Sequence, residues 1–322
     1  MDEQRLATYR ERYRNANVPL IIEFKCSYAL SSKMQNHLDL FREFLNQSEK
    51  WELFVFTIAD DYYRTREMIR ALSGLMANGR YKFPNLKYFI PYRTPSVHRE
   101  TPTLHANRLP DGGLFENWSV PKLESIISMN GMWKFFDPDP PPVQTFSLDV
   151  SSYDLLSMTY SGYILSYIDY FSPMIRDLTL SFDWTFFFSQ ATSFLLLEFP
   201  MVTRFTLHVT CAMPLLNPRV PMVSMATFLN LPSLKRATVT IMRTLPLRDL
   251  SVQEFVGVYR NVLSPFGKAP QLNDITIIVC PIYDKENTRR IQYNYPNESD
   301  YYGEDMFEIL PYVRQLLVVA IG

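Results

Sequence analysis

Glycine is scarce in this sequence, at 10 of 322 residues. None of the glycines belongs to a GxGxxG, GxxxxGK(S/T) or GxSxG motif, the loops that bring backbone close to a phosphate or present a catalytic serine. His98 and His105 are separated by a spacing that matches no usual zinc site. We therefore expect no enzyme, no cofactor and no metal. An α/β enzyme with no recognisable motif stays an alternative, as does a purely structural scaffold.

Cysteine is also rare. Cys26, Cys211 and Cys280 stand far apart and form no CxxC pair. Isolated cysteines are typical of proteins kept in a reducing compartment. The charged N-terminus lacks the apolar core of a signal peptide. The sequence thus predicts an intracellular protein, cytoplasmic or nuclear.

Neither sign of charge is in excess, because 32 Lys and Arg oppose 33 Asp and Glu for a net charge of −1. Such a balance provides no global field toward nucleic acid or an anionic membrane. The longest apolar stretch, residues 186–202, is interrupted by Gln190, Thr192 and Glu198. It falls short of the roughly 20 apolar residues that cross a bilayer. We expect no nucleic acid and no membrane among the partners.

Proline, in contrast, is abundant, with 23 residues, and many of them open a recurring phrase. In this phrase an apolar residue follows two positions after the proline, and further apolar residues follow at five and seven positions. The eight copies begin at Pro84, Pro121, Pro141, Pro173, Pro200, Pro232, Pro270 and Pro311. The pattern is typical of a leucine-rich-repeat strand, in which the last two apolar residues point inward and their neighbours face solvent. Proline is tolerated at the entry of a strand because no ladder hydrogen bond is donated there.

The segments between these copies are long enough for crossovers between parallel strands. Several show helical periodicity, namely residues 153–170, 184–199, 222–231, 250–263 and 306–310. Two earlier units pair a strand at 18–24 with a helix at 37–46, and a strand at 51–58 with a helix at 66–77. The predicted fold class is α/β. We expect an irregular leucine-rich-repeat-like solenoid with a curved parallel sheet on one face and helices on the other.

We expect one domain over residues 1–322. Residues 1–17 form an N-terminal capping helix in this prediction, since a terminal repeat needs a polar outer face. About ten strand-helix units then fill residues 18–322, with loop insertions near 92–119 and 283–305.

The order of these pieces resembles the region downstream of the F-box in fungal F-box/leucine-rich-repeat-like proteins. The resemblance is carried by residues 17–24, 38–45, 48–53 and 83–87, and by the later Pro-x-Leu copies. It implies a solenoid that holds a target while an N-terminal F-box docks to a cullin ubiquitin ligase. Only about 16 residues precede the first predicted strand, whereas a three-helix F-box needs roughly forty. We therefore expect the solenoid region without the F-box, and the cullin ligase machinery as a partner only if an F-box lies upstream.

The sequence predicts a non-catalytic protein-binding module that recognises a protein target on the exposed sheet face. The candidate binding residues stand four, six and eight positions after the prolines: Asp177, Thr179, Arg204, Thr206, His208, Arg236, Thr238, Asp274 and Thr276. Equivalent positions on parallel strands lie side by side, so Asp177 should pair with Arg204 and Asp274 with Arg236. The two central guanidiniums would then face an acidic segment of a partner. Alternatively, threonine is simply favoured on exposed strands, and the charges keep the face soluble.

Overall fold

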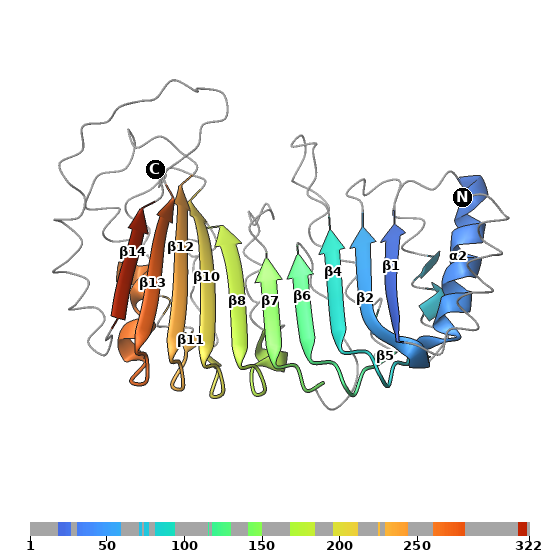
Figure 1. Cartoon of the computed structure of the whole chain (residues 1–322). Coiled ribbons are helices and arrows are strands. Elements are labelled where there is room, and N and C mark those ends of the chain that lie inside the picture. The colour runs from blue at the N-terminus through green and yellow to red at the C-terminus, as the bar shows by residue number, and fades with distance from the viewer. Residues whose placement is uncertain are drawn as a thin grey trace, which may run out of the picture.

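A computed structural model describes residues 19–26, 31–58, 71–72, 74–76, 81–93, 115, 118–129, 141–149, 168–183, 196–211, 225, 229–243, 260–280 and 315–320. Its main feature is a ten-stranded sheet in which every neighbouring pair of strands is parallel. The order of the strands in the sheet is their order in the chain (Figure 1). The fold is therefore mixed α/β with a large parallel sheet, as the sequence predicted.

The ten strands are β1 (Leu20–Cys26), β2 (Trp51–Ile58), β4 (Tyr88–Arg93), β6 (Ser125–Met129), β7 (Thr145–Asp149), β8 (Asp177–Asp183), β10 (Arg204–Cys211), β12 (Arg236–Arg243), β13 (Asp274–Cys280) and β14 (Gln315–Ala320). The eight strands from β4 onward each begin four residues after the proline of a predicted copy. This offset stays constant although the spacing between the prolines varies.

The proline forms part of a tight turn before the strand. Phe83 accepts a backbone hydrogen bond from Leu86 at 3.3 Å, and Leu231 accepts one from Leu234 at 3.2 Å. In both turns the proline is the second residue, where its fixed φ is already suitable. Proline therefore stabilises the turn that leads into the strand. From the sequence we expected only that proline would be tolerated at the entry of the strand.

Successive units are also joined just before their strands. The carbonyl of Arg176 accepts from the amides of Thr203 at 2.9 Å and Arg204 at 3.2 Å, and the carbonyl of Thr203 accepts from Lys235 at 3.0 Å and Arg236 at 3.1 Å. The same double acceptance recurs at Lys87, Glu124, Gln144 and Lys235. The residues three positions after the prolines of the copies from Pro84 to Pro270 therefore form a column along this edge of the sheet.

The inward side chains of the strands form the core. One inward position can be followed in register through nine strands, and its members are all buried: Ile22, Phe54, Phe89, Ile126, Phe146, Leu178, Phe205, Ala237 and Ile275. The alternation of apolar inward and polar outward residues confirms the predicted inward positions.

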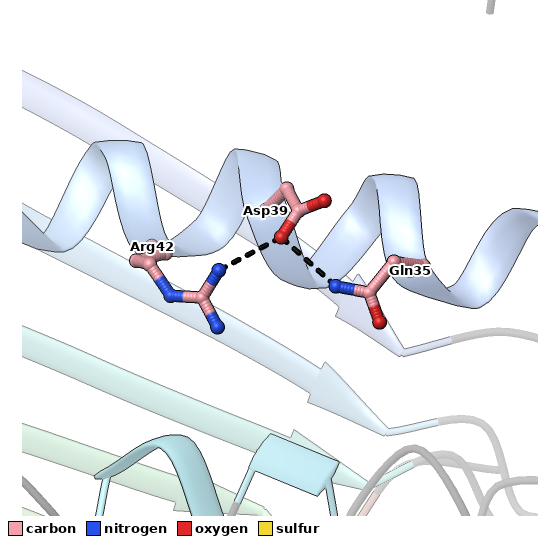
Figure 2. A network of polar contacts seen from close by, with 3 residues as sticks. All are labelled: Gln35, Asp39 and Arg42. Carbon is pink, nitrogen blue, oxygen red and sulfur yellow. Dashed lines mark hydrogen bonds and ion pairs between the residues drawn. The ribbon is translucent and has the colours of Figure 1, made fainter.

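Helix α2 (Ser31–Leu45) packs on the inward side of the first strands, beside β1 in Figure 1. Leu38, Phe41 and Leu45 are buried along one face of the helix, and the ring of Phe41 lies 4.6 Å from that of Phe24, centroid to centroid. Outside this face, Asp39 accepts hydrogen bonds from Gln35 at 2.9 Å and Arg42 at 2.8 Å (Figure 2). These pairs three and four residues apart support the helix.

A cluster of aromatic residues fills the core behind β2 and β4. Trp51, Phe54, Phe83, Phe115 and Trp118 are all buried. The rings of Phe83 and Trp118 stack with centroids 3.9 Å apart, and the ring of Trp51 lies 5.0 Å from that of Phe83. Aromatic rings bury large areas and favour such contacts.

The last residues of two predicted helices are extended in the structure. The predictions at 184–199 and 222–231 finish in the short strands β9 (Leu197–Glu198) and β11 (Leu229–Asn230), which pair in parallel. The residue before a proline is disfavoured in the helical conformation, and Phe199 and Leu231 precede Pro200 and Pro232. The chain is therefore extended before each of these turns, which the helical periodicity had hidden.

The predicted insertion near 92–119 is likewise too wide. Its first residues belong to β4, and its last residues form β5 (Trp118–Ser119), which pairs with β3 (Tyr81–Lys82). Short helical stretches at 71–72, 74–76, 168–171 and 260–263 match parts of the predicted helices. The 3-10 helices η1 (Ser48–Lys50) and η6 (Phe266–Lys268) complete the elements. The predicted capping helix at 1–17, the insertion at 283–305 and the helix at 306–310 lie outside the described residues.

Candidate protein-binding site

The outward positions of four neighbouring strands form rows across the sheet. Asp177, Arg204, Arg236 and Asp274 are successive register partners on β8, β10, β12 and β13. Thr179, Thr206, Thr238 and Thr276 form the next row. This alignment, which the repeat pattern predicted, is confirmed by the register of the strands.

Asp177 and Arg204 form the predicted ion pair. Arg204 donates from Nε to Oδ1 of Asp177 at 2.5 Å and from Nη2 to Oδ2 at 2.6 Å, a two-point geometry that suits a guanidinium and a carboxylate. The hydrogen bond to Asp177, and then the negative charge of Asp177, raise the pKa of Arg204. The Arg204 side chain is 66% exposed and that of Asp177 29%. Asp177 therefore fixes the orientation of an arginine that still faces solvent.

The second predicted pair is wrong. Arg236 and Asp274 are register partners, but no ion pair joins them in the described part of the chain. An exposed pair gains little energy and must order a long side chain. Arg236 instead lines a pocket together with residues from the β8 and β10 units.

This pocket is open and has a volume of about 470 Å³. It lies where β7, β8, β10 and β12 begin, and its lining comes from two adjacent residues of each unit: Gln144 and Thr145, Arg176 and Asp177, Thr203 and Arg204, Lys235 and Arg236. Four of these side chains are cationic and one is anionic. The pocket is thus strongly basic in a chain whose net charge is −1.

Five of these eight lining residues were missed from the sequence, and one of them, Thr145, begins a strand that the predicted site did not include. Gln144, Arg176, Thr203 and Lys235 stand three residues after their prolines, one position before the strands begin. The sequence prediction counted only the alternating positions inside the strands. Polar residues recur at this earlier position in the other copies too, for example Lys87 and Asn273, and that recurrence is a signal that would have identified the column.

The cations of this column and of the pocket differ in their partners. Lys87 donates to Glu52 at 2.9 Å, and this hydrogen bond, together with the charge of Glu52, raises the pKa of Lys87. Arg176, Lys235 and Arg236 have no ion pair or side-chain hydrogen bond within the described ranges. The pocket therefore gathers three cations whose charge is not compensated by a described carboxylate.

His208 lies in a third outward row with Asp149, Ser181 and Thr240. Burial lowers the pKa of His208, and the charge of Asp149 acts in the opposite direction. Serine, histidine and aspartate are the residue types of a catalytic triad, but a triad needs the imidazole between the other two groups. Here Ser181 occupies the middle strand. Neither Ser181 nor His208 makes a side-chain hydrogen bond with a described residue, so this row does not resemble an activated nucleophile.

Other kinds of site have no support in the described parts of the chain. They contain no group of three His, Cys, Asp or Glu side chains that would hold a metal ion. His98 and His105 lie outside them. No helix among these residues is both long enough and apolar enough to cross a bilayer.

Comparisons with known proteins give no family for this chain. No family model matches it, and no curated protein shows significant similarity to its sequence.

Proposed function

We propose that this chain is an irregular leucine-rich-repeat-like solenoid that binds another protein across the exposed face of its parallel sheet. The observation that carries the proposal is the set of polar rows, which run in register over β8, β10, β12 and β13 beside an open basic pocket. Equivalent positions in successive units create an extended surface of the kind that solenoids use for partners.

The backbone supports the repeat interpretation. Eight strands share the same distance from a proline, and six carbonyls accept two amides from the following unit. The strands also follow one another in chain order. Such nearest-neighbour contacts between equivalent units are typical of repeat proteins.

The pocket favours binding over catalysis. Its lining provides cations, hydroxyl groups and one amide, and its single carboxylate already holds Arg204. These groups suit a charged polypeptide segment, whereas covalent catalysis requires a nucleophile beside a general base. A purely structural scaffold does not require three cations without a described carboxylate partner in a single pocket.

The resemblance to fungal F-box/leucine-rich-repeat-like proteins extends the proposal to the substrate-binding part of an intracellular ubiquitin-ligase adaptor. In that role the sheet face holds the target, and a cullin ligase joins through an F-box in the complete protein. Precipitation of the full-length protein from its native cells, followed by detection of a cullin, tests this extension. Target binding without a cullin would leave only the recognition role.

Variants of the sheet face test the central proposal. Replacing both Thr206 and Thr238 by Arg places two long charged side chains in the middle of the threonine row. Replacing Asn36 and Asn46, which are exposed on and after α2, by Arg is the matched control. Partners that co-purify with the wild-type chain are purified, and their dissociation constants are measured by calorimetry. We expect the face variant to weaken binding by about tenfold or more, with melting temperatures close to the wild type. Equal affinities of the face and control variants would contradict the proposal.

A further inference from the structure

The positions of the unpaired cations suggest the shape of the partner segment. Arg176 and Lys235 occupy equivalent positions in units that are two strands apart, with Thr203 between them. Neighbouring strands are about 4.8 Å apart, so these two positions are separated by roughly 9.6 Å. A peptide extended in the polyproline II conformation has three residues per turn and advances about 3.1 Å per residue, so side chains three residues apart face the same way and lie roughly 9.3 Å apart.

We propose that the pocket binds an extended acidic segment of the partner that crosses the strands at their amino-terminal edge, with acidic side chains three residues apart. This inference rests on the proposed function, since it names the chemistry of the partner at the same sheet face. One carboxylate of the segment pairs with Arg176, and the other pairs with Lys235 and Arg236. Gln144, Thr145 and Thr203 offer hydrogen bonds to the peptide backbone between them.

Carboxylates fit this lining better than a phosphoryl group. Sites for a phosphoryl group commonly use free backbone amides that converge on one point. Here the amides of Arg176, Thr203, Arg204, Lys235 and Arg236 all donate to the preceding unit. The available cations belong to two units on either side of Thr203, and the cation between them, Arg204, is already paired with Asp177. Carboxylates that are spaced along the partner segment therefore match the cations of the pocket better than one phosphoryl group does.

Short fluorescein-labelled peptides of Ala, Ser and Thr test the spacing. One peptide carries two Asp residues three positions apart, the second has them adjacent, the third has a single phosphoserine, and the fourth is uncharged. Binding to the full chain is measured by fluorescence anisotropy at about 50 mM and about 300 mM salt. We expect the spaced peptide to bind most tightly and to weaken at the higher salt. Binding of the adjacent peptide should be at least about threefold weaker.

Three variants locate the contact. Arg176→Gln and Lys235→Gln should each weaken the spaced peptide by about threefold to fivefold, and each should bring its affinity close to that of the adjacent peptide. Lys268→Gln removes an exposed lysine of η6 and should leave the affinity unchanged. Thermal unfolding of each variant shows whether the fold is retained.

Equal binding of the spaced and adjacent peptides, or tighter binding of the phosphoserine peptide, would overturn the inference. So would an Arg176→Gln variant that binds like the wild type. In each of these cases the proposed function still stands if the Thr206→Arg, Thr238→Arg variant has lost its protein partner. If that variant keeps its partner while the peptides bind as expected, the proposed function fails and the peptide site remains.

Discussion

Leu207 and Thr206 are neighbours on β10 that face opposite sides of the sheet. Leu207 is fully buried between Leu180 and Val239 in the second inward position, and Thr206 lies in the outward threonine row. Leu207→Ala removes three carbon atoms, worth about 2.4 kcal/mol of transfer free energy. Strands on both sides limit collapse of the cavity, so the free energy of unfolding should fall by about 3–4 kcal/mol.

Thr206→Ala, at a half-buried position, is the matched comparison, and it should cost at most about 1 kcal/mol, because only strand propensity and partly exposed contacts are lost. Urea unfolding followed by circular dichroism measures both costs. At about 2.1 cal/mol/K per residue, the Leu207→Ala cost corresponds to a fall in melting temperature of roughly 5 °C. Equal costs, or a larger cost for Thr206→Ala, would mean that the two faces of β10 are assigned the wrong way round.

Three further changes test other parts of the structure. Pro200→Gly frees the turn before β10 and should lower the free energy of unfolding by about 0.5–1 kcal/mol, measured by urea unfolding. Phe83→Ala opens the aromatic cluster and should cost about 3–5 kcal/mol in the same assay, whereas Tyr88→Ala, at an exposed position, should cost far less. Because burial lowers the pKa of His208, its contribution to stability is complete above about pH 6.5 and is lost as the pH falls through the folded-state pKa. Thermal unfolding between about pH 7.5 and 5 should therefore show a weaker pH dependence for His208→Gln than for the wild type, and identical profiles would refute this assignment.

The strands were predictable because proline and apolar residues both leave a local trace. A proline at the second position of a turn fixes where the strand begins, and alternation then fixes its inward face, as at Phe205 and Leu207. The register followed from this constant offset, so the row from Asp177 to Asp274 was predicted correctly.

The connecting segments were less predictable. Apolar residues such as Leu197 and Leu229 fit a helical period, yet they are extended because a proline follows shortly after and a neighbouring unit offers a pairing partner. Side-chain pairing was predicted correctly for Asp177 and Arg204 but not for Arg236 and Asp274, since register brings two residues side by side but does not decide the rotamer of an exposed arginine. The basic pocket depends on residues ahead of the strands, and alternation within strands gives no information about them.

Because of the shared carbonyls along the edge of the sheet, the length of a unit can change without moving its surface residues. In many proteins these two properties change together. Each of the six units that contain β6, β7, β8, β10, β12 and β13 is located by two amides that donate to the unit before it, immediately ahead of the strand. Residues added between one of these strands and the next proline therefore do not alter the register. Lengthening a flexible connector costs little free energy. The outward rows can therefore keep their alignment while connectors grow or shrink, so the sequences of the connectors can change without altering the outward face of the sheet.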